Sequence, residues 1–205
     1  MNRGGETVSR RTFVSGLAGG VSLLAAPALV APSWPRALAA DGARDHGRVN
    51  PPLPPPDIEI VAHDGTKTRL PALLRGHATA LHAMFTICQA TCPIQGAIFA
   101  RVQKLLPDQR ARKVQLVSLS IDPRRDTPPV LRKWLDGFHA RPGWTAAAPS
   151  AEADGETVRT FTGGGSTPAD NHTTQVLVFN RQGLLIWRTF DFPEAEEIVS
   201  ILRKV

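Results

Sequence analysis

The sequence contains little cysteine, with only two such residues in 205. So few thiols exclude a small scaffold held together by many disulfides, and they exclude a zinc site built from four thiolates. Hydrophobic residues make up 42% of the chain and charged residues 20%, a composition that supports a buried core and is not typical of disorder. The chain is therefore expected to form one domain of ordinary size, with additional residues outside that domain.

The chain also lacks the pattern of a nucleic-acid-binding protein, although its formal net charge of +6 first suggests one. Half of that charge lies in residues 1–39, and the remainder is spread along the chain without aromatic residues between the basic ones. Nucleic-acid binding needs a basic stripe together with aromatic side chains on which bases can stack. No nucleic-acid partner is expected.

The N-terminal segment has the pattern of an export signal. Arg10 and Arg11 precede an apolar run over residues 16–30, and residues 37–39 form a small-x-small cleavage pattern. The segment resembles a twin-arginine (Tat) signal, which implies a periplasmic or other extracytoplasmic protein. Three glycines, two serines and Pro27 interrupt residues 13–31, so cleavage is expected, and an uncleaved membrane anchor is the alternative. Membrane contact is expected only in that second case.

The remaining chain divides into a segment over residues 40–56 and a domain over residues 57–205. Five prolines fall within residues 51–56, and because proline fixes φ and lacks an N–H donor, they predict an extended linker or an approach to a sheet edge. Alternation and helical periodicity predict the elements of the domain. Expected strands cover 58–62, 79–86, 114–121, 175–179 and 184–188, and expected helices cover 94–106, 129–138, 151–161 and 194–204.

Strands alternate with helices, and a hairpin followed by a helix closes the chain. This order predicts an α/β fold, namely a single thioredoxin-like domain whose central mixed β-sheet is flanked by helices. In the helix over 129–138, Val130, Trp134 and Phe138 are expected to lie on one face.

Both cysteines lie between an expected strand and an expected helix. Cys88 and Cys92 are four residues apart, so one turn brings their thiols to the same side, and the positive end of the helix dipole favours thiolate over thiol. Two converging thiolates can close a disulfide or bind a soft metal ion. The three-residue spacer is wider than that of redox CxxC motifs, which favours a metal alongside redox chemistry, with a permanent structural disulfide as the alternative.

Two further segments carry candidate site residues. Asp122 and Asp126 follow the clearest strand, where loops of α/β domains line the functional crevice, but residues of these types also serve as helix caps and turn residues. Asp170, Asn171 and His172 precede a late strand, and His172 is one of six histidines, distinguished by its place between loop and strand.

Taken together, these motifs resemble the Sco/SenC family over about residues 57–205. The resemblance rests on Phe85-Thr86-x-Cys88-x-x-x-Cys92-Pro93, on Asp122-Pro123-x-x-Asp126-Thr127-Pro128 with the preceding Ser120-Ile121, and on the late histidine. It implies a thioredoxin-like protein that binds copper, as Cu(I) and/or Cu(II), through Cys88, Cys92 and His172. Asp122, Asp126, Asp170 and Asn171 are then candidates to support the ligands, with Asp170 and Asn171 orienting the imidazole.

The resemblance further implies an exported copper chaperone that delivers copper to a CuA-type site of a respiratory oxidase, with reduction of that site's cysteines as an additional role. Its expected partners are a CuA-bearing oxidase subunit or another copper client, a thiol reductant, and an upstream copper donor. The alternative is an enzyme, a metal-independent thiol–disulfide oxidoreductase or peroxidase-like protein in which Cys88 and Cys92 form the redox pair. A copper or redox sensor is a third interpretation.

Overall fold

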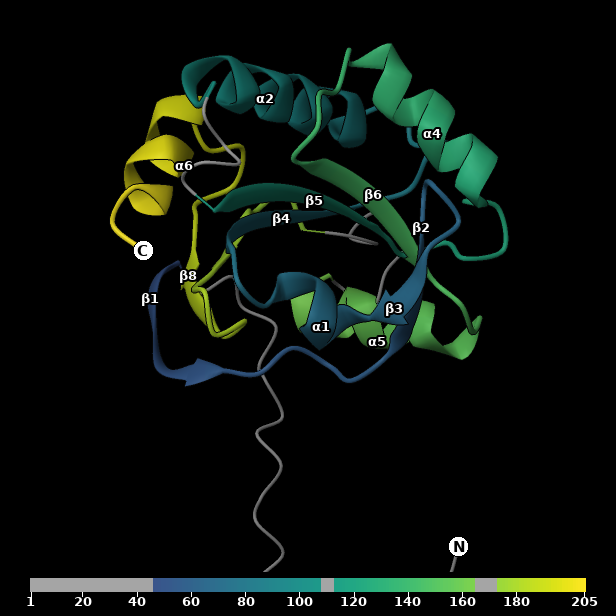
Figure 1. Cartoon of the computed structure of the whole chain (residues 1–205), viewed down its shortest axis with the longest axis horizontal. Helices are drawn as coiled ribbons and strands as arrows, with labels where there is room; N and C mark the ends of the chain where they lie inside the picture. The colour runs from purple at the N-terminus through teal and green to yellow at the C-terminus, as the bar shows by residue number, and fades with distance from the viewer. Residues whose placement is uncertain (1–45, 108–112, 165–172) are drawn as a thin grey trace, which may run out of the picture. The chain divides into compact units, whose positions relative to one another are not determined.

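One mixed β-sheet of eight strands forms the centre of the protein. The structure is a computed structural model that describes residues 46–107, 113–164 and 173–205. The strand order is β1-β8-β7-β4-β5-β6-β2-β3, and helices lie against both faces of the sheet (Figure 1). The prediction of a single α/β domain with a central mixed sheet is confirmed.

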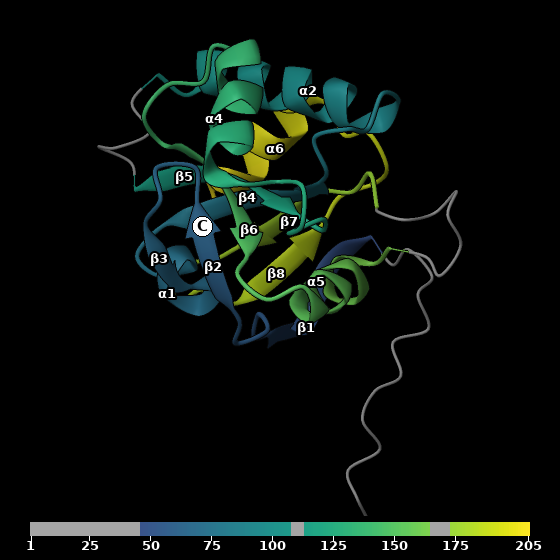
Figure 2. The same cartoon turned by 90° about the vertical axis from the view of Figure 1, so that its right-hand side faces the viewer.

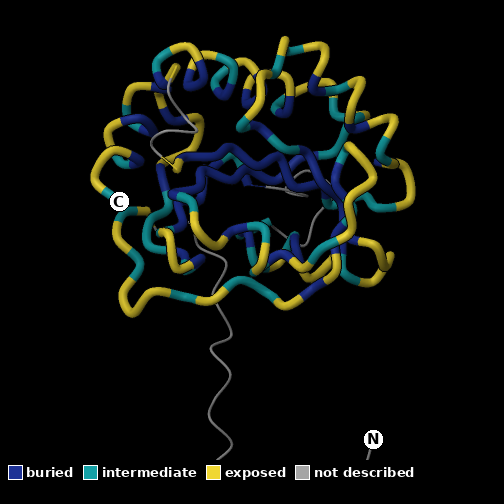
Figure 3. The backbone as a smooth tube through the Cα atoms, viewed as in Figure 1, coloured by how far each residue is buried: buried dark blue, intermediate teal, exposed yellow. Residues whose placement is uncertain are grey.

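Three neighbouring strands at the centre of the sheet are parallel. These are β4 (Ala78–Met84), β5 (Val114–Ser120) and β6 (Trp144–Pro149). All seven residues of β4 and of β5 are buried, as Figure 3 shows for the middle of the sheet. Strands covered on both faces are rich in apolar residues, and the polar residues that β4 and β5 do contain, Thr79, His82, Gln115, Ser118 and Ser120, are buried as well. Because the three strands are parallel, their carboxyl ends lie at the same edge of the sheet, and the loops that follow the strands leave from that edge.

Antiparallel strands extend the sheet on both sides. The predicted hairpin is confirmed as β7 (Leu177–Phe179) and β8 (Leu185–Arg188), with β7 antiparallel to β4. On the other side, β2 (Glu59–Ala62) pairs with β6 and with β3 (Lys67–Arg69).

An edge strand lies within the proline-rich segment. Residues Gly47–Leu53 form β1, which pairs with β8 through an irregular register. Pro51 and Pro52 lack N–H donors and are tolerated because β1 has a partner on one side only. The expected approach to a sheet edge is therefore a paired strand that begins ten residues before the predicted start of the domain at residue 57.

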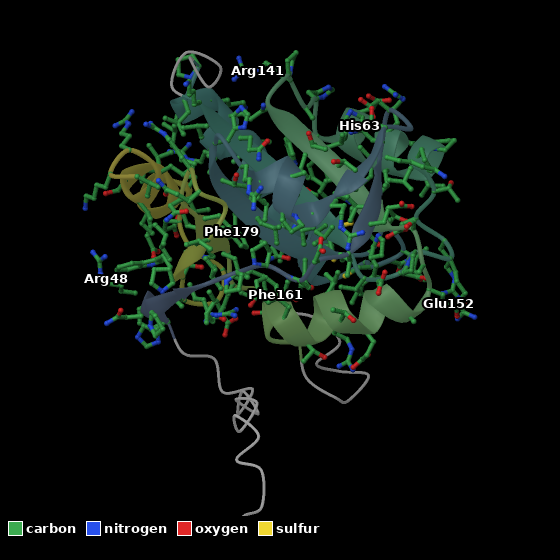
Figure 4. All side chains as sticks on the ribbon, turned by 60° about the horizontal axis from the view of Figure 1, so that its bottom comes forward. Arg48, His63, Arg141, Glu152, Phe161 and Phe179 are labelled. Carbon is green, nitrogen blue, oxygen red and sulfur yellow. The ribbon has the colours of Figure 1, made fainter. Side chains whose placement is uncertain are left out.

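The helices form a layer on each face of the sheet (Figures 1 and 2). One layer contains α2 (Thr91–Leu105), α4 (Pro128–Gly137) and α6 (Ala195–Leu202), and the other contains α1 (Leu70–Leu74) and α5 (Ala153–Thr162). In the second layer, Phe161 of α5 packs against Phe179 of β7 with ring centroids 6.3 Å apart (Figure 4). Each layer buries its own cluster of apolar side chains against the sheet.

Two leucines form the buried face of α4. Leu131 and Leu135 are buried, whereas Trp134 and Phe138 are only partly buried and Val130 is 36% exposed. The two leucines are four residues apart and define the stripe that contacts the sheet, so Val130, one position earlier, faces solvent. The face of Val130, Trp134 and Phe138 is therefore the partly exposed side of α4, next to the buried leucines.

Helix α2 approaches the end of α4 so closely that Gly96 has no room for a side chain. A Cβ atom built on Gly96 would lie 2.3 Å from the ring of Phe138. Gly96→Ala is therefore expected to lower the free energy of unfolding by about 1–3 kcal/mol, because the ring of Phe138 must shift in a packed layer. Gly137→Ala is the control, since no atom lies within 4 Å of its Cβ position. Urea denaturation measures the free energy of unfolding of both variants. An equal decrease in the two variants would contradict the close contact between Gly96 and Phe138.

Candidate metal centre

The two cysteines lie on the turn that connects β4 to α2. After β4 ends at Met84, the N–H of Cys88 donates to the carbonyl oxygen of Phe85 at 3.1 Å, which closes a tight turn. Helix α2 begins at Thr91, so Cys92 falls in its first turn, and its N–H donates to the sulfur of Cys88 at 3.4 Å. The predicted order of strand, turn and helix is present, but α2 begins three residues before the predicted residue 94, so Cys92 lies within the helix and not before it. The turn brings the two residues together.

The two thiols have different environments. Cys92 is completely buried, whereas Cys88 is partly exposed and its sulfur lies 3.6 Å from the hydroxyl oxygen of Thr91. Burial raises the pKa of Cys92 to about 12. For Cys92, desolvation therefore outweighs the positive end of the helix dipole, which was expected to favour the thiolate. The metal-free site holds at least one protonated thiol at neutral pH.

The difference in exposure predicts an order of chemical modification. With iodoacetamide in excess, Cys88 is expected to react at least about tenfold faster than Cys92, because the reagent reaches only Cys88 without local unfolding. Mass spectrometry of peptides from timed samples measures the order. The same reaction in denaturant is the control, in which the two rates should converge. Faster labelling of Cys92 in the folded protein would contradict the burial.

Asp126 holds the cysteine turn against the loop that follows β5. Its side chain is 1% exposed and accepts hydrogen bonds from the N–H of Thr86, at 3.2 and 3.3 Å, and from the Thr86 hydroxyl. The hydroxyl of Ser120 donates to the same carboxylate at 2.5 Å. Burial raises the pKa of Asp126 above its ordinary value and outweighs these hydrogen bonds, which lower it. Asp126 thus fixes the position of Thr86, two residues before Cys88.

Asp122 has a different role in the same loop. Its carboxylate pairs with Arg125 at 2.8 Å, and its N–H donates to the hydroxyl of Ser120 at 2.9 Å. Helix α4 starts after Thr127 without a side-chain hydrogen bond at its cap. Neither aspartate therefore caps α4, which was one of the two interpretations of this motif. Asp122 shapes the loop, and Asp126 joins it to the cysteine turn.

The third expected ligand falls in a part of the chain for which no structure is given. Asp170, Asn171 and His172 lie outside the described residues, which resume at Thr173. Since β7 is antiparallel to β4, the chain enters β7 at the edge where β4 ends, which is the edge of the cysteine turn. Within the described ranges, no group of three or more His, Cys, Asp or Glu side chains could hold a metal ion.

Sequence reasoning missed a polar network beneath the cysteine-bearing helix. His82 is completely buried in β4, and its ring lies 2.7 Å from the hydroxyl of Ser118 and 3.4 Å from the amide oxygen of Gln95. The indole N–H of Trp144 also donates to Ser118, at 2.9 Å. Gln95 lies one turn after Cys92, so this network fixes the start of α2 on the sheet. The signal available in the sequence was Gln95, a polar residue on the inward face of α2, which needs a buried hydrogen-bond partner.

The whole domain matches a known family. The SCO1/SenC family description matches residues 56–205. The chain belongs to this family. Over 68 residues, it is 31% identical to a SCO2-like protein of Rickettsia prowazekii, and that match covers 33% of each chain. The chain thus spans about a third of the length of this SCO2-like relative.

Solved SCO1/SenC-like structures share the fold. Bradyrhizobium japonicum ScoI with copper bound has a TM-score of 0.60 and 21% identity, covering 74% of this chain and 99% of that one. BsSco, described as a Sco-family cytochrome c oxidase assembly protein with a disulfide switch, has a TM-score of 0.62 and 20% identity. The latter match covers 75% of this chain and 93% of BsSco. Both likenesses confirm the thioredoxin-like fold of the Sco structures.

Within the residues that the structure describes, no helix combines the length and apolar character needed to cross a membrane.

Proposed function

We propose that this SCO1/SenC-family chain is an exported copper chaperone. It binds one copper ion through Cys88, Cys92 and His172 and delivers the ion to a CuA-type site of a respiratory oxidase. The observation that carries the proposal is the placement of both cysteines on one turn, with the backbone nitrogen of Cys92 3.4 Å from the sulfur of Cys88. In support, a ScoI structure of the same fold was solved with copper bound.

The donor set suits copper as a cargo. Two thiolates and one imidazole form a soft set of low coordination number that matches Cu(I) and also accepts Cu(II). Binding requires both sulfurs to lose their protons, so copper replaces the proton that burial keeps on Cys92. With three protein ligands, the ion retains an open position at which a client's ligand can bind before Cys88, Cys92 or His172 leaves.

Redox chemistry of the pair is the competing function. The two cysteines are close enough for hydrogen bonding, and BsSco is described as having a disulfide switch. Oxidation removes both thiolates from the copper site, so disulfide formation and copper binding exclude one another. In a metal-independent thiol–disulfide oxidoreductase or peroxidase-like enzyme, a disulfide or peroxide substrate would oxidise the pair to a disulfide, and a thiol reductant would reduce it again, with no metal.

A copper titration of the reduced protein separates the two functions. The chaperone is expected to bind one equivalent of Cu(I) in competition with a coloured chelator, with weaker binding in His172→Ala. His139→Ala, at an exposed turn after α4, is the control and should bind like the wild type. Failure to bind copper, together with turnover of the pair by a dithiol reductant, would establish the enzyme instead.

The cellular setting completes the proposal. We assign residues 1–39 to a Tat-type signal that is removed on export, so that the exported chain starts a few residues before β1. Because Tat substrates cross the membrane folded, the cysteines would remain reduced until the protein meets copper or an oxidant outside. An upstream copper donor and a thiol reductant are the partners that this route requires.

A further inference from the structure

The large hydrophobic side chains that are exposed among the described residues all lie at the edge of the sheet where β4, β5 and β8 end. Five large hydrophobic residues are at least 36% exposed, and they are Ile87, Ile94, Val130, Phe190 and Phe192. Ile87 and Ile94 flank the cysteines, and Val130 lies in the first turn of α4, after the loop that follows β5. Phe190 and Phe192 follow β8.

The sheet topology places these segments together. Both β4 and β8 are antiparallel to β7, so they are parallel to one another, and β5 is parallel to β4. The segments that follow β4, β5 and β8 therefore all leave the same edge. Scattered exposed hydrophobic residues are ordinary on a protein surface, but their confinement to one functional edge indicates an interaction site. We call these five residues the apolar edge.

The charged residues near the apolar edge indicate whether its partner is acidic or basic. Residues 190–197 contain four carboxylates and no lysine or arginine, and one of the carboxylates, Glu196, pairs with Arg101. In the loop after β5, Arg125 pairs with Asp122 at 2.8 Å, and Arg124 pairs with Glu152 at 3.2 Å. The charge of both arginines in that loop is thus balanced by a carboxylate. The segment after β8 therefore gives this edge of the sheet a net negative charge. An anionic lipid surface would be repelled, whereas a basic protein surface would be attracted.

We propose that the apolar edge is the docking surface for the protein that accepts copper from this chain. The fitting partner surrounds its own metal site with apolar side chains and carries lysine or arginine at the rim. This inference deepens the proposed chaperone function and rests on it. Contact between the apolar surfaces excludes water, and the carboxylates of residues 190–197 orient the partner and speed its approach.

Docking also determines which protein ligand is exchanged first. Cys88 is partly exposed and Cys92 is buried, so the acceptor reaches copper from the side of Cys88. A thiolate or imidazole of the acceptor donates an electron pair to copper as the bond from copper to the Cys88 sulfur breaks. The released thiolate takes up a proton from water, and the oxidation state of copper does not change.

Transfer kinetics test the docking surface. The probe is the metal-free CuA domain of the oxidase from the same cell, and a small Cu(I) chelator serves as an acceptor that needs no docking. Phe190→Ser/Phe192→Ser and Ile94→Ser are expected to slow transfer to the CuA domain at least tenfold, with the same rate to the chelator as the wild type. Lys204→Ser, at an exposed position after α6, is the control and should match the wild type in both assays.

Ionic strength tests the acidic part of the surface. Glu194→Gln/Glu197→Gln is expected to slow transfer to the CuA domain several-fold at low salt, and the difference should vanish at high salt, where charges are screened. An unchanged rate in the phenylalanine and Ile94 variants would overturn the proposal. Equal slowing towards the chelator would also overturn it, because the residues would then act on copper binding itself.

Two binding measurements test whether the apolar edge binds a lipid surface or a second copy of the chain instead of the copper acceptor. Phosphatidylglycerol vesicles that bind the wild type but not the phenylalanine variant would assign the edge to a lipid surface. A dimer in sedimentation experiments that the same variant dissociates would assign it to a second copy of the chain. Either result overturns docking of an acceptor, and wild-type protein that binds no copper overturns the chaperone function and this proposal with it. If the wild type binds copper and only docking fails, the chaperone function stands.

Discussion

Replacing Cys88 or Cys92 with serine is expected to lower the affinity for Cu(I) by more than about 100-fold. Loss of a group that merely orients a metal ligand costs 10–100-fold in affinity, so loss of a soft thiolate ligand should cost more. Serine keeps the size and hydrogen-bonding capacity of the side chain but offers copper a hard hydroxyl oxygen. Competition with a chelator, in the presence of a reductant that does not bind copper, measures the change.

Folding must be checked separately for the two serine variants. Cys92 is completely buried and belongs to the core cluster on the α2 side of the sheet, so its serine variant also places a hydroxyl in an apolar site. Cys88 is partly exposed, and its serine variant should retain the stability of the wild type. Ser200→Ala, on the exposed face of α6, is the control. Wild-type copper affinity in a folded Cys88→Ser protein would remove this residue from the site.

Asp126→Ala is expected to lower the free energy of unfolding by about 2–4 kcal/mol. The substitution leaves the N–H and hydroxyl of Thr86 and the hydroxyl of Ser120 without their acceptor in a buried place. The cysteine turn then loses its attachment to the loop after β5, so we also expect copper affinity to fall by about tenfold. Thermal unfolding and the chelator competition measure the two effects.

Two further variants distinguish this role from a general loss of packing. Asp126→Asn retains a hydrogen-bond acceptor for Thr86, so its stability and its copper affinity should both lie closer to those of the wild type than in Asp126→Ala. Asp122→Ala removes a carboxylate whose partner Arg125 is exposed, so it should cost less than about 1 kcal/mol. If Asp122→Ala proved as harmful as Asp126→Ala, the proposed attachment of the cysteine turn by Asp126 would be wrong.

Asp126 also predicts a pH dependence of stability. Its pKa is raised in the folded protein, chiefly by burial, so the folded state binds the proton more tightly than the unfolded state does. Stability from this group is therefore greatest at low pH and is lost as the pH rises through the folded pKa. As the pH falls from 7 towards 4, the wild type should gain stability relative to Asp126→Asn, which has no proton to bind. A constant difference in urea unfolding between the two would contradict the raised pKa.

The sequence was sufficient for those parts of the site that depend on local pattern. Cys88 and Cys92 fall between an apolar run and a helical periodicity, and such a strand–turn–helix unit positions both residues without reference to the rest of the chain. The function of Asp126 was not predictable in this way. It depends on the parallel register of β4 with β5, which places Met84 opposite Ser120 and thereby brings Thr86 near a residue 40 positions away.

Several elements escaped prediction because their local signals are weak. β6 contains three consecutive alanines, which have low strand propensity, and it forms a strand because β5 and β2 pair with it on both sides. α1 has only five residues and shows no helical period. β1 contains two prolines and exists through its pairing with β8. In each case, tertiary contacts decide the conformation.

X-ray absorption spectroscopy of the Cu(I)-loaded, reduced protein tests the central claim most directly. A site formed by Cys88, Cys92 and His172 predicts two sulfur ligands and one nitrogen ligand on copper. In the His172→Ala variant, the nitrogen contribution should disappear while both sulfurs remain. A copper environment in the wild type with no nitrogen ligand, or one that His172→Ala leaves unchanged, would contradict the three-ligand site.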